Sequence, residues 1–564
     1  MSIDFKRSWV IMPYRQLLYI LFLIFVFACK NSNKPREKDI VETTQQLEER
    51  TAENLKKLLD YAAQNKDKIN DSVKLTSLSL LQAAYSNNNF KTIWSHEDTW
   101  QPLADSLYEM ISRAKEYGLF PSDYHFSSLT SIRSRLEVDS LARRDAALWT
   151  RGDVLFTEAY FAIARHLKLG RLPKDSITLR KDSLFNDNYF IENFNGAITN
   201  KNIIGSLQVL EPKYPGYIDV KNGIRPFLQN AVFKKYTYLN YPYKDTLAFV
   251  KTLQQRLSED GFAAISPEAD STSLAVSIAN YQLSLDLKPT GKISESIVRG
   301  LNNTDWEQFK SIAVTLDQYK LMADFVPETF VMVNLPAYSL YVYNADTLVF
   351  QSRVIIGSPK TKTPLLNSRI SNFITYPQWT VPYSIIFREM LPKIQKNVDY
   401  LEQQNLMVVD RDENVVDPYS IDWSQLNKKS FPYLLRQKEG DDNSLGIIKF
   451  NFVNKYSVYL HDTNARWLFS KASRALSHGC VRVQKWEDLS RYLTSSDTIR
   501  FPPDSLKAWI GRQEKHTVTG FPRMPLFIRY FIVEGKKGKL LFYNDIYGYN
   551  RLIKEKYFTR KTIS

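Results

Sequence analysis

The sequence predicts a multi-domain protein of the α+β class, on three observations. The chain has 564 residues, of which 44% are hydrophobic, enough for two or three domains that each bury a core. Apolar residues recur at helical spacing between residues 40 and 245. From residue 329 onward the pattern changes to short β-branched and aromatic runs separated by turn residues. A helical region should therefore precede a mostly β region.

Composition excludes several protein classes. Gly and Pro number only 19 and 24, and the mean hydropathy is −0.34. These values exclude a collagen-like fibre, a disordered chain and a polytopic membrane protein. Two cysteines in 564 residues cannot form a disulfide framework, so the role of each cysteine has to be considered separately.

Residues 1–29 predict a lipoprotein signal peptide. A basic start precedes Leu17–Ala28, an uncharged apolar run of 12 residues, which is shorter than the roughly 20 that a membrane-spanning helix needs. The run ends in Val-Phe-Ala followed by Cys29, which resembles a bacterial lipobox whose cysteine is acylated and becomes the mature N-terminus. A signal anchor with a chance cysteine is the alternative.

Residues 30–45 are polar at their start and predict a flexible tether. Either interpretation of the first 29 residues takes the protein out of the cytoplasm. We expect it in the cell envelope, on the periplasmic side, anchored to a membrane through Cys29. Export makes nucleic acid an improbable partner for the net charge of +15. Anionic lipid head groups, wall polymer or a solvated basic surface without a specific partner stay open.

Residues 46–245 predict a helical scaffold domain. Leu47, Leu55, Leu58 and Leu59 recur at helical spacing. The segment 154–167 is almost entirely apolar and stops before a glycine, which predicts a buried helix. No arrangement of residues in this region suggests catalysis.

Residues 246–303 predict three short helices around a Pro-Thr-Gly turn at 289–291. This stretch resembles the small three-helix peptidoglycan-binding domain, through segments 253–257, 281–282, 285–291 and 301–302. Residues 266–270 replace the glycine-rich turn of that family, so glycan binding and a purely structural role are both open. Residues 304–328 predict a connecting helix.

Residues 329–555 predict the β region. Strands are expected at 329–334, 340–343, 348–356, 449–452 and 456–460, with a terminal hairpin-like pair at 526–533 and 539–543. A polar, partly helical insertion at 386–445 interrupts this series, and insertions of such length are usually functional or disordered.

Chemistry concentrates around the second cysteine. The local sequence runs from Ser477 through His478, Gly479 and Cys480 to Arg482, and His461 lies 19 residues before the cysteine. A neighbouring imidazole favours the thiolate of a cysteine, and a glycine lets backbone N–H groups approach an oxyanion. The pattern also predicts a helix over 486–493 that opens at the cysteine and adds its partial positive charge.

Three alternatives to a nucleophile are open for Cys480. A buried cysteine is often inert, and a free exported thiol could be accidental. His461, His478 and Cys480 could be three zinc ligands, but no second cysteine or obvious carboxylate completes the spacing. We therefore expect a cysteine nucleophile with no metal and no cofactor.

The same residues resemble the active-site signature of the L,D-transpeptidases with a YkuD-type catalytic domain. The signature is carried by His461-Asp-Thr463 and by Ser477-His-Gly-Cys-Val-Arg-Val483. Further segments are similar to the large, multi-domain branch of that family: 117–125, 170–173, 376–385 with Glu389, Leu391 and Pro392, 445–446 with Phe450 and Asn454, 459–463, 525–531, 538–540 and 545–549. The resemblance covers roughly residues 100–550 of the chain.

This resemblance implies acyl transfer within peptidoglycan. Cys480 would attack the third residue of a donor tetrapeptide stem, D-Ala would leave, and the amine of a second stem would resolve the thioester to a 3–3 cross-link. His461 is implied as general base and acid, His478 as support of the pocket, and Gly479 as backbone oxyanion donor. Substrate contacts are expected from Arg482, Trp379, Tyr383 and Ser477, with the insertion at 386–445 acting as a lid.

Other outcomes use the same site. Water as the acceptor would make an L,D-carboxypeptidase, and a protein amine would attach that protein to the wall. A non-catalytic peptidoglycan-binding lipoprotein is the alternative from another class. The oligomeric state is not predicted.

Overall fold

The computed structural model describes residues 35–71, 73–262 and 271–558, which divide into two compact units. Among these residues, the first unit holds 35–171 and 181–211, and the second holds 172–180 and 212–558. Cys29, the predicted signal peptide and the start of the tether lie outside the described residues. A bilayer-spanning helix, judged by length and apolar content, is not found within those ranges.

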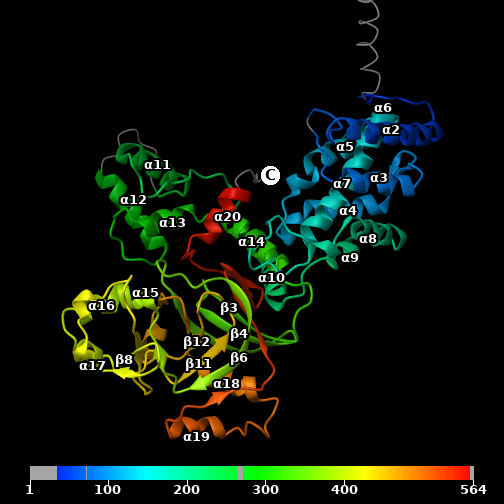
Figure 1. The fold of residues 1–564 in the computed structure, drawn as a ribbon. Helices are drawn as coiled ribbons and strands as arrows, with labels where there is room; N and C mark the ends of the chain where they lie inside the picture. The colour runs from blue at the N-terminus through cyan, green and yellow to red at the C-terminus, as the bar shows by residue number, and fades with distance from the viewer. Residues whose placement is uncertain (1–34, 72, 263–270, 559–564) are drawn as a thin grey trace, which may run out of the picture. The chain divides into compact units, whose positions relative to one another are not determined.

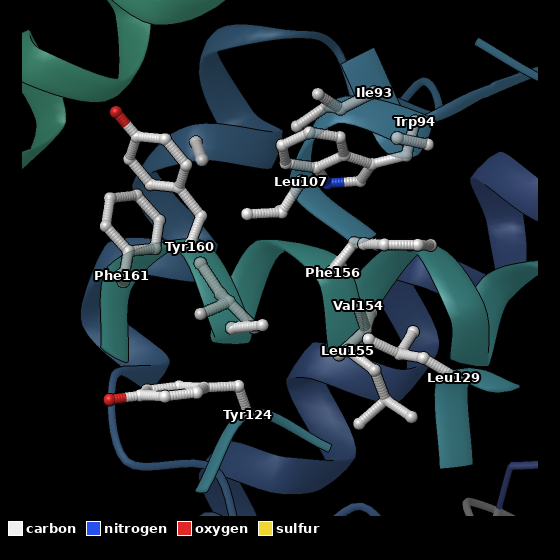
Figure 2. Packing of buried hydrophobic residues seen from close by; sticks show 14 of the residues in the cluster. Ile93, Trp94, Leu107, Tyr124, Leu129, Val154, Leu155, Phe156, Tyr160 and Phe161 are labelled. Atoms are coloured by element: carbon white, nitrogen blue, oxygen red, sulfur yellow. The ribbon is translucent and has the colours of Figure 1, made fainter. Parts of the chain in front are cut away.

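The first unit is a bundle of helices around one central helix (Figure 1). That helix, α7 (Ala146–Lys168), has 19 of its 23 residues buried, as expected of a helix surrounded by others. Figure 2 shows aromatic and aliphatic side chains packed around it, and confirms the buried helix predicted at 154–167. Its neighbours are α2 (Thr44–Gln64), α3 (Leu78–Asn87), α4 (Pro102–Ser112), α5 (Phe126–Val138), α8 (Asp187–Thr199) and α9 (Ile203–Gln208).

A buried carboxylate ties this bundle to the loop that precedes α4. Asp153 of α7 accepts hydrogen bonds from the backbone N–H groups of Ile93 (3.1 Å) and Trp94 (3.0 Å), and from the hydroxyl of Tyr85 (2.7 Å). Burial raises the pKa of Asp153 to about 6. One side chain therefore satisfies three buried donors.

The second unit opens with helices. They are α10 (Pro215–Asn230), α11 (Thr246–Glu259), α12 (Ser271–Ser284), α13 (Glu295–Asn302) and α14 (Asp305–Lys320). The middle three form a small domain with its own core, which includes Leu253, Ile278 and Leu301. The three predicted helices are therefore present, while the turn at 266–270 lies outside the described residues. Residues 212–245, which the sequence suggested as part of the scaffold, cluster with this second unit.

A sheet of ten strands follows and closes on itself. Its path is β11-β12-β14-β5-β4-β3-β16-β6-β15, with β13 beside β5, and β11 also pairs with β6. The strands are β3 (Thr329–Asn334), β4 (Ser339–Asn344), β5 (Thr347–Gly357), β6 (Leu366–Thr375), β11 (Ile448–Phe452), β12 (Leu460–His461), β13 (Ala475–Ser477), β14 (Val481–Val483), β15 (Thr517–Val518) and β16 (Met524–Arg529). Because β11 has partners on both sides, neither strand edge is left unpaired there.

The insertion between β6 and β11 is a folded subdomain. It contains a second sheet, β7-β10-β8-β9, made of β7 (Trp379–Thr380), β8 (Leu406–Val409), β9 (Val415–Val416) and β10 (Leu434–Gln437). A core that includes Ile386, Ile394 and Leu435 lies beneath three short helices, α15 (Tyr383–Ile385), α16 (Leu391–Ile394) and α17 (Tyr400–Gln403). The last residue of β6, Thr375, pairs with the first residue of β11, Ile448.

The terminal hairpin differs from its prediction. Residues 526–533 do not form one strand that pairs with 539–543. Instead β16 lies between β3 and β6 in the main sheet, and a separate hairpin joins β17 (Val533–Lys536) to β18 (Lys539–Phe542). The chain leaves the sheet after Arg529, and Gly538, at φ +73°, makes the tight turn of the real hairpin. Helices α18 (Trp486–Thr494), α19 (Ser505–Gly511) and α20 (Tyr549–Tyr557) complete the unit.

Candidate active site

Three neighbouring strands place basic side chains in one row. Lys449 of β11 pairs with His461 of β12, and His461 pairs with Arg482 of β14. Directly paired residues project from the same face of a sheet. Tyr459 and Cys480 come directly before β12 and β14, two residues before His461 and Arg482, and Tyr459 interacts with both Cys480 and Lys449.

Cys480 lies in the short connection between β13 and β14 and is partly exposed. Leu460 pairs with Val481, so β14 runs parallel to β12 immediately after the cysteine. The predicted helix exists as α18, but it begins only at Trp486. The expectation that Cys480 opens a helix is therefore wrong, because the alternating residues Val481-Arg-Val483 extend the sheet first.

Burial dominates the titration of the thiol. It raises the pKa of Cys480, while the backbone N–H and the hydroxyl of Tyr459 and the charges of Lys449 and Arg482 lower it. Since burial is the largest effect, the resting cysteine is a neutral thiol near pH 7. It needs a base to become a nucleophile.

Tyr459 connects the thiol to the rest of the site. Its hydroxyl interacts with the side chains of Cys480 and Trp379, and burial raises the pKa of Tyr459 well above its usual value. The ammonium of Lys449 lies 4.3 Å from the centre of the Tyr459 ring, in the geometry of a cation–π contact. The Tyr459 and His461 rings meet edge to face at 5.4 Å.

His461 is only 5% exposed. Burial, with the nearby charges of Arg482 and Lys449, lowers the pKa of His461 to about 3. The imidazole is therefore neutral in any physiological medium and can accept a proton. Its Nδ1 atom is buried and has no hydrogen-bond partner.

The next residue, Asp462, holds the chain around His461 in place. Its carboxylate accepts from the backbone N–H of Ile447 (3.1 Å) and pairs with Arg466 at 2.6 Å. Gly446 has a positive φ of +62°, and a Cβ there would lie 2.4 Å from Asp462 Oδ2. Only glycine therefore allows this close approach.

Hydrogen bonds within the cysteine loop engage Ser477 and Gly479. The Ser477 hydroxyl donates to the carbonyl of Cys480 (2.6 Å) and accepts from the N–H of Gly479 (3.1 Å). The hydroxyl of Thr363 donates to the Gly479 carbonyl at 2.8 Å. Gly479 has φ +126°, and a Cβ there would lie at the ordinary contact distance of 3.8 Å from the carbonyl oxygens of Thr361 and Lys362, so its conformation, not crowding, requires glycine.

His478 contacts the inserted subdomain. Its Nε2 atom lies 2.7 Å from Oε1 of Glu389, in a pair that is about two-fifths exposed on each side. Glu389 belongs to a π-helical turn, Ile386–Met390, of the inserted subdomain, and such turns are frequent at functional sites. The insertion therefore contacts the loop that carries the cysteine.

The remaining predicted site residues lie in two places. Arg482 is in the row, where burial lowers its pKa, and its Nε atom is buried without a hydrogen-bond partner. Trp379 stands on β7 beside Tyr459, and its side chain interacts with the Tyr459 hydroxyl. Tyr383 is half-exposed and stacks on Phe387 inside the insertion at 5.8 Å.

Three residues of the site were not among the predicted ones: Lys449, Tyr459 and Glu389 in its contact with His478. Strand alternation could have identified Tyr459, because it stands two residues before His461. Lys449 is a charge within the otherwise neutral strand Ile448–Phe452. No sequence signal indicates the contact of Glu389, because it depends on the tertiary fold of the insertion.

No cluster of three or more His, Cys, Asp or Glu side chains able to hold a metal occurs in the described part of the chain. His461, His478 and Cys480, all of them described, are thus not gathered as zinc ligands would be.

Comparison with known proteins identifies two domains. Residues 328–500 match the L,D-transpeptidase catalytic domain family (YkuD), and residues 79–223 match a scaffold domain family. A Haemophilus influenzae protein that is itself only a predicted L,D-transpeptidase is 34% identical over 252 residues, which cover 43% of this chain and 49% of that protein. The chain thus spans about half the length of this relative.

Solved structures also match this chain, among them the following two. One is the carbamoyl-enzyme of Ldtfm with avibactam (12% identity, TM-score 0.17), which covers 40% of this chain and 63% of that one. The other is a mutant L,D-transpeptidase of Enterococcus faecium (11% identity, TM-score 0.17), with coverage of 40% and 64%. At these TM-scores neither structure contributes to the argument.

Proposed function

Because the chain carries an L,D-transpeptidase catalytic domain of the YkuD type together with a scaffold domain, we propose that it forms 3–3 cross-links between peptidoglycan stem peptides. Cys480 is the nucleophile of this proposal. The donor is a tetrapeptide stem, the leaving group is its terminal D-Ala, and the acceptor is the side-chain amine of a second stem.

One observation carries the proposal. A thiol that is neutral at rest stands two residues before Arg482, and Arg482 pairs with His461, whose imidazole is neutral as well; Lys449 pairs with His461 on its other side. Among the described residues, no ion pair neutralises Lys449 or Arg482 within 4.0 Å, although both interact with Cys480. A nucleophile, a base and a site for negative charge are thus gathered on one face.

In the acylation step, His461 takes the proton of the Cys480 thiol as the sulfur attacks the carbonyl carbon of the third stem residue. The resulting oxyanion lies near the charges of Lys449 and Arg482. The Gly479 N–H is already engaged by Ser477, which leaves the N–H of Cys480 as the backbone donor of this loop. When the C–N bond breaks, His461 returns the proton to the departing D-Ala amine.

In the second step, the acceptor amine attacks the thioester carbonyl and loses a proton to His461. Collapse of the intermediate breaks the C–S bond, and the sulfur takes the proton back as a thiol. Water at this point would give a shortened stem instead of a cross-link. The insertion, which meets the cysteine loop through Glu389 and His478, would favour the amine by limiting access of water.

Arg482 is proposed to hold a carboxylate of the donor stem. Its Nε atom is buried without a partner, and a guanidinium presents two parallel donors that match a carboxylate. Trp379 would line the same cleft through its position beside Tyr459.

The test is to incubate the protein with a disaccharide-tetrapeptide and to measure products by mass spectrometry. We expect cross-linked dimer from the wild type, and none from Cys480→Ala or His461→Ala. Tyr456→Phe, at a half-exposed tyrosine on the turn before β12, is the matched control. Dimer formation by Cys480→Ala would overturn the proposal.

Two further readouts separate the alternatives. Tripeptide without dimer would identify a carboxypeptidase. A carbapenem adduct on Cys480, with neither product, would show a reactive thiol whose acceptor is a protein amine. The absence of all three would leave a wall-binding protein.

We also propose that Cys29 is acylated and anchors the protein to a membrane of the envelope. The support is the sequence of residues 1–29. Metabolic labelling with a radioactive fatty acid should mark the wild type and leave Cys29→Ser unlabelled. Labelling of that variant would show that acylation, if present, is elsewhere.

A further inference from the structure

A cavity of about 330 Å³ lies in the second unit, away from the cysteine row. Apolar side chains from five separate segments form its walls: Ile177, Leu321, Leu365, Phe531 and the α20 residues Leu552 and Ile553. This volume is at the lower end of the range typical of small-molecule sites, about 300–1,000 Å³. The cavity is not a gap between loose loops, because the backbone N–H of Leu179 donates to the Leu321 carbonyl at 2.9 Å across one side.

The lining of this apolar cavity includes one buried cation, the guanidinium of Arg529. Arg529, the last residue of β16, lines the cavity and is only 3% exposed. Its Nη1 atom donates to the carbonyls of Leu366 (2.9 Å) and Ile528 (3.2 Å), and its Nη2 atom donates to Asn367 Oδ1. These acceptors account for three of the five N–H donors of a guanidinium and fix its orientation.

None of these acceptors is a carboxylate. Two other buried cations show the usual arrangement: Lys320 lies 2.9 Å from Asp317, and Arg256 lies 2.7 Å from Asp260. No carboxylate of the described residues lies within ion-pair distance of Arg529. Burial accordingly lowers the pKa of Arg529 to about 10, and a buried charge without a counter-ion is costly.

Asp175 is the carboxylate that raises the pKa of Arg529 through its charge. It lines the cavity at an exposed position. Its Oδ1 atom is engaged by the Thr178 hydroxyl (2.8 Å) and the Ile177 N–H (3.1 Å). Asp175 thus shapes the turn at the entrance and does not neutralise the guanidinium. The deep part of the cavity therefore combines a fixed positive charge with hydrocarbon walls.

We propose that this cavity binds a free aliphatic carboxylate, with the carboxylate on the Arg529 guanidinium and the hydrocarbon chain against Leu321, Phe531 and Leu552. A carboxylate would supply the missing counter-charge and take the remaining N–H donors. The chain would bury apolar surface in walls that are already formed, at little cost in ordering. This site is separate from the proposed transpeptidase site and does not depend on that activity.

The experiment is photo-crosslinking of the full-length protein with a dodecanoate that carries a diazirine near its methyl end, followed by peptide mapping. The matched probe is the corresponding alcohol, which has the same chain and no charge. We expect the carboxylate to label peptides from 315–325 or 545–558 at least tenfold more than the alcohol does, and excess decanoate to compete.

Two variants make the result decisive. Arg529→Gln keeps a side-chain donor for the carbonyls and should abolish the preference for the carboxylate. Leu552→Trp narrows the cavity from a residue that is 55% exposed, so it should fold normally and lose labelling, whereas Leu247→Trp, at an 84% exposed position, should not. Equal labelling by both probes, an unchanged preference in Arg529→Gln, or labelling of other peptides only would overturn the proposal.

Discussion

The Nε2 atom of His478 and the Oε1 atom of Glu389 lie 2.7 Å apart, and this hydrogen bond joins the inserted subdomain to the cysteine loop. Glu389 is positioned by the residues on either side of it, because Ile386 and Met390 are buried in the core of the insertion. On the other side, His478 stands two residues before Cys480. A movement of the insertion therefore acts directly on the segment that carries the nucleophile.

Breaking this contact should shift the balance from transfer to hydrolysis. In Glu389→Gln, which keeps the shape but removes the charge, we expect dimer to fall about threefold to tenfold while tripeptide rises relative to dimer. The products of a disaccharide-tetrapeptide assay measure both. Glu402→Gln, at an exposed glutamate of the same subdomain, is the control, and an unchanged ratio in Glu389→Gln would exclude this role for the contact.

Removing the positive charge of Lys449 should make the thiol less acidic. Lys449 lowers the pKa of Cys480, so Lys449→Met should slow alkylation by iodoacetamide at pH 8 about threefold to tenfold, and Tyr459→Phe should act in the same direction. The measurement needs a Cys29→Ser background, so that one thiol is reported. Lys455→Met, on the turn before β12, should behave as wild type, and faster alkylation of Lys449→Met would contradict the assignment.

The rate of acylation should show no inflection from the titration of His461 between pH 5 and 8. The pKa of His461 is lowered to about 3 and that of Cys480 is raised, so neither group changes its protonation state between pH 5 and 8, and in the proposed mechanism the proton passes from one to the other. The rate of acylation by a carbapenem should therefore vary less than about threefold between pH 5 and 8. In His461→Ala only the thiolate reacts, and the rate should rise about tenfold per pH unit. A wild-type inflection near pH 6.5 would mean that the imidazole is not buried as described.

The same shift predicts sensitivity of the fold to acid. The folded-state pKa of His461 is below its ordinary value of 6.5, so the unfolded chain binds the extra proton. Stability should fall as pH decreases from about 6.5 toward 3, by up to about 1.4 kcal/mol per pH unit. Urea unfolding of wild type and His461→Gln at pH 5 and 7 measures this, and an equal loss in both proteins would assign acid sensitivity to other groups.

In the first unit, Asp153→Ala should leave the buried N–H groups of Ile93 and Trp94 without their acceptor, while the Tyr85 hydroxyl keeps Thr157 as a partner at 2.8 Å. We expect a loss of about 2 kcal/mol or more, since each unsatisfied buried group costs about 1–3 kcal/mol. Hydrogen exchange of the α7 amides, followed by mass spectrometry, reports this unit within the full chain. Asp105→Asn, which removes an exposed ion pair with Arg133, should cost less than about 1 kcal/mol. Equal effects would show that the buried network contributes little.

The spacing of apolar residues predicted much of this fold, because it reflects which side chains are buried. The helix within α7 and the strands β3, β4 and β5 each follow from apolar runs with clear limits. The hairpin at the C-terminal end was misplaced, because Leu526–Val533 is apolar almost throughout. Nothing in such a run marks the point after Arg529 where the chain leaves the main sheet.

The nucleophile and the base were predictable from their residue types, whereas the charges around them were not. Lys449 and His461 are 12 residues apart in sequence and become neighbours only through strand pairing. The buried cation Arg529 could not be predicted either, because the sequence around a single arginine in an apolar strand does not indicate whether a counter-ion lies beside it. Electrostatic surroundings depend on register, and register is a tertiary property.

The pairing of Thr375 with Ile448 has a consequence for how this protein could be altered. About 70 residues leave and re-enter the sheet at adjacent positions, so the insertion is in effect a very long hairpin turn. Replacing residues 377–445 with a single asparagine would leave the β6–β11 register intact and keep Gly446, in a short Asn-Gly turn. The same two positions could receive the corresponding segment of another protein. The insertion can therefore be exchanged as a module, without rebuilding the strands that hold Cys480.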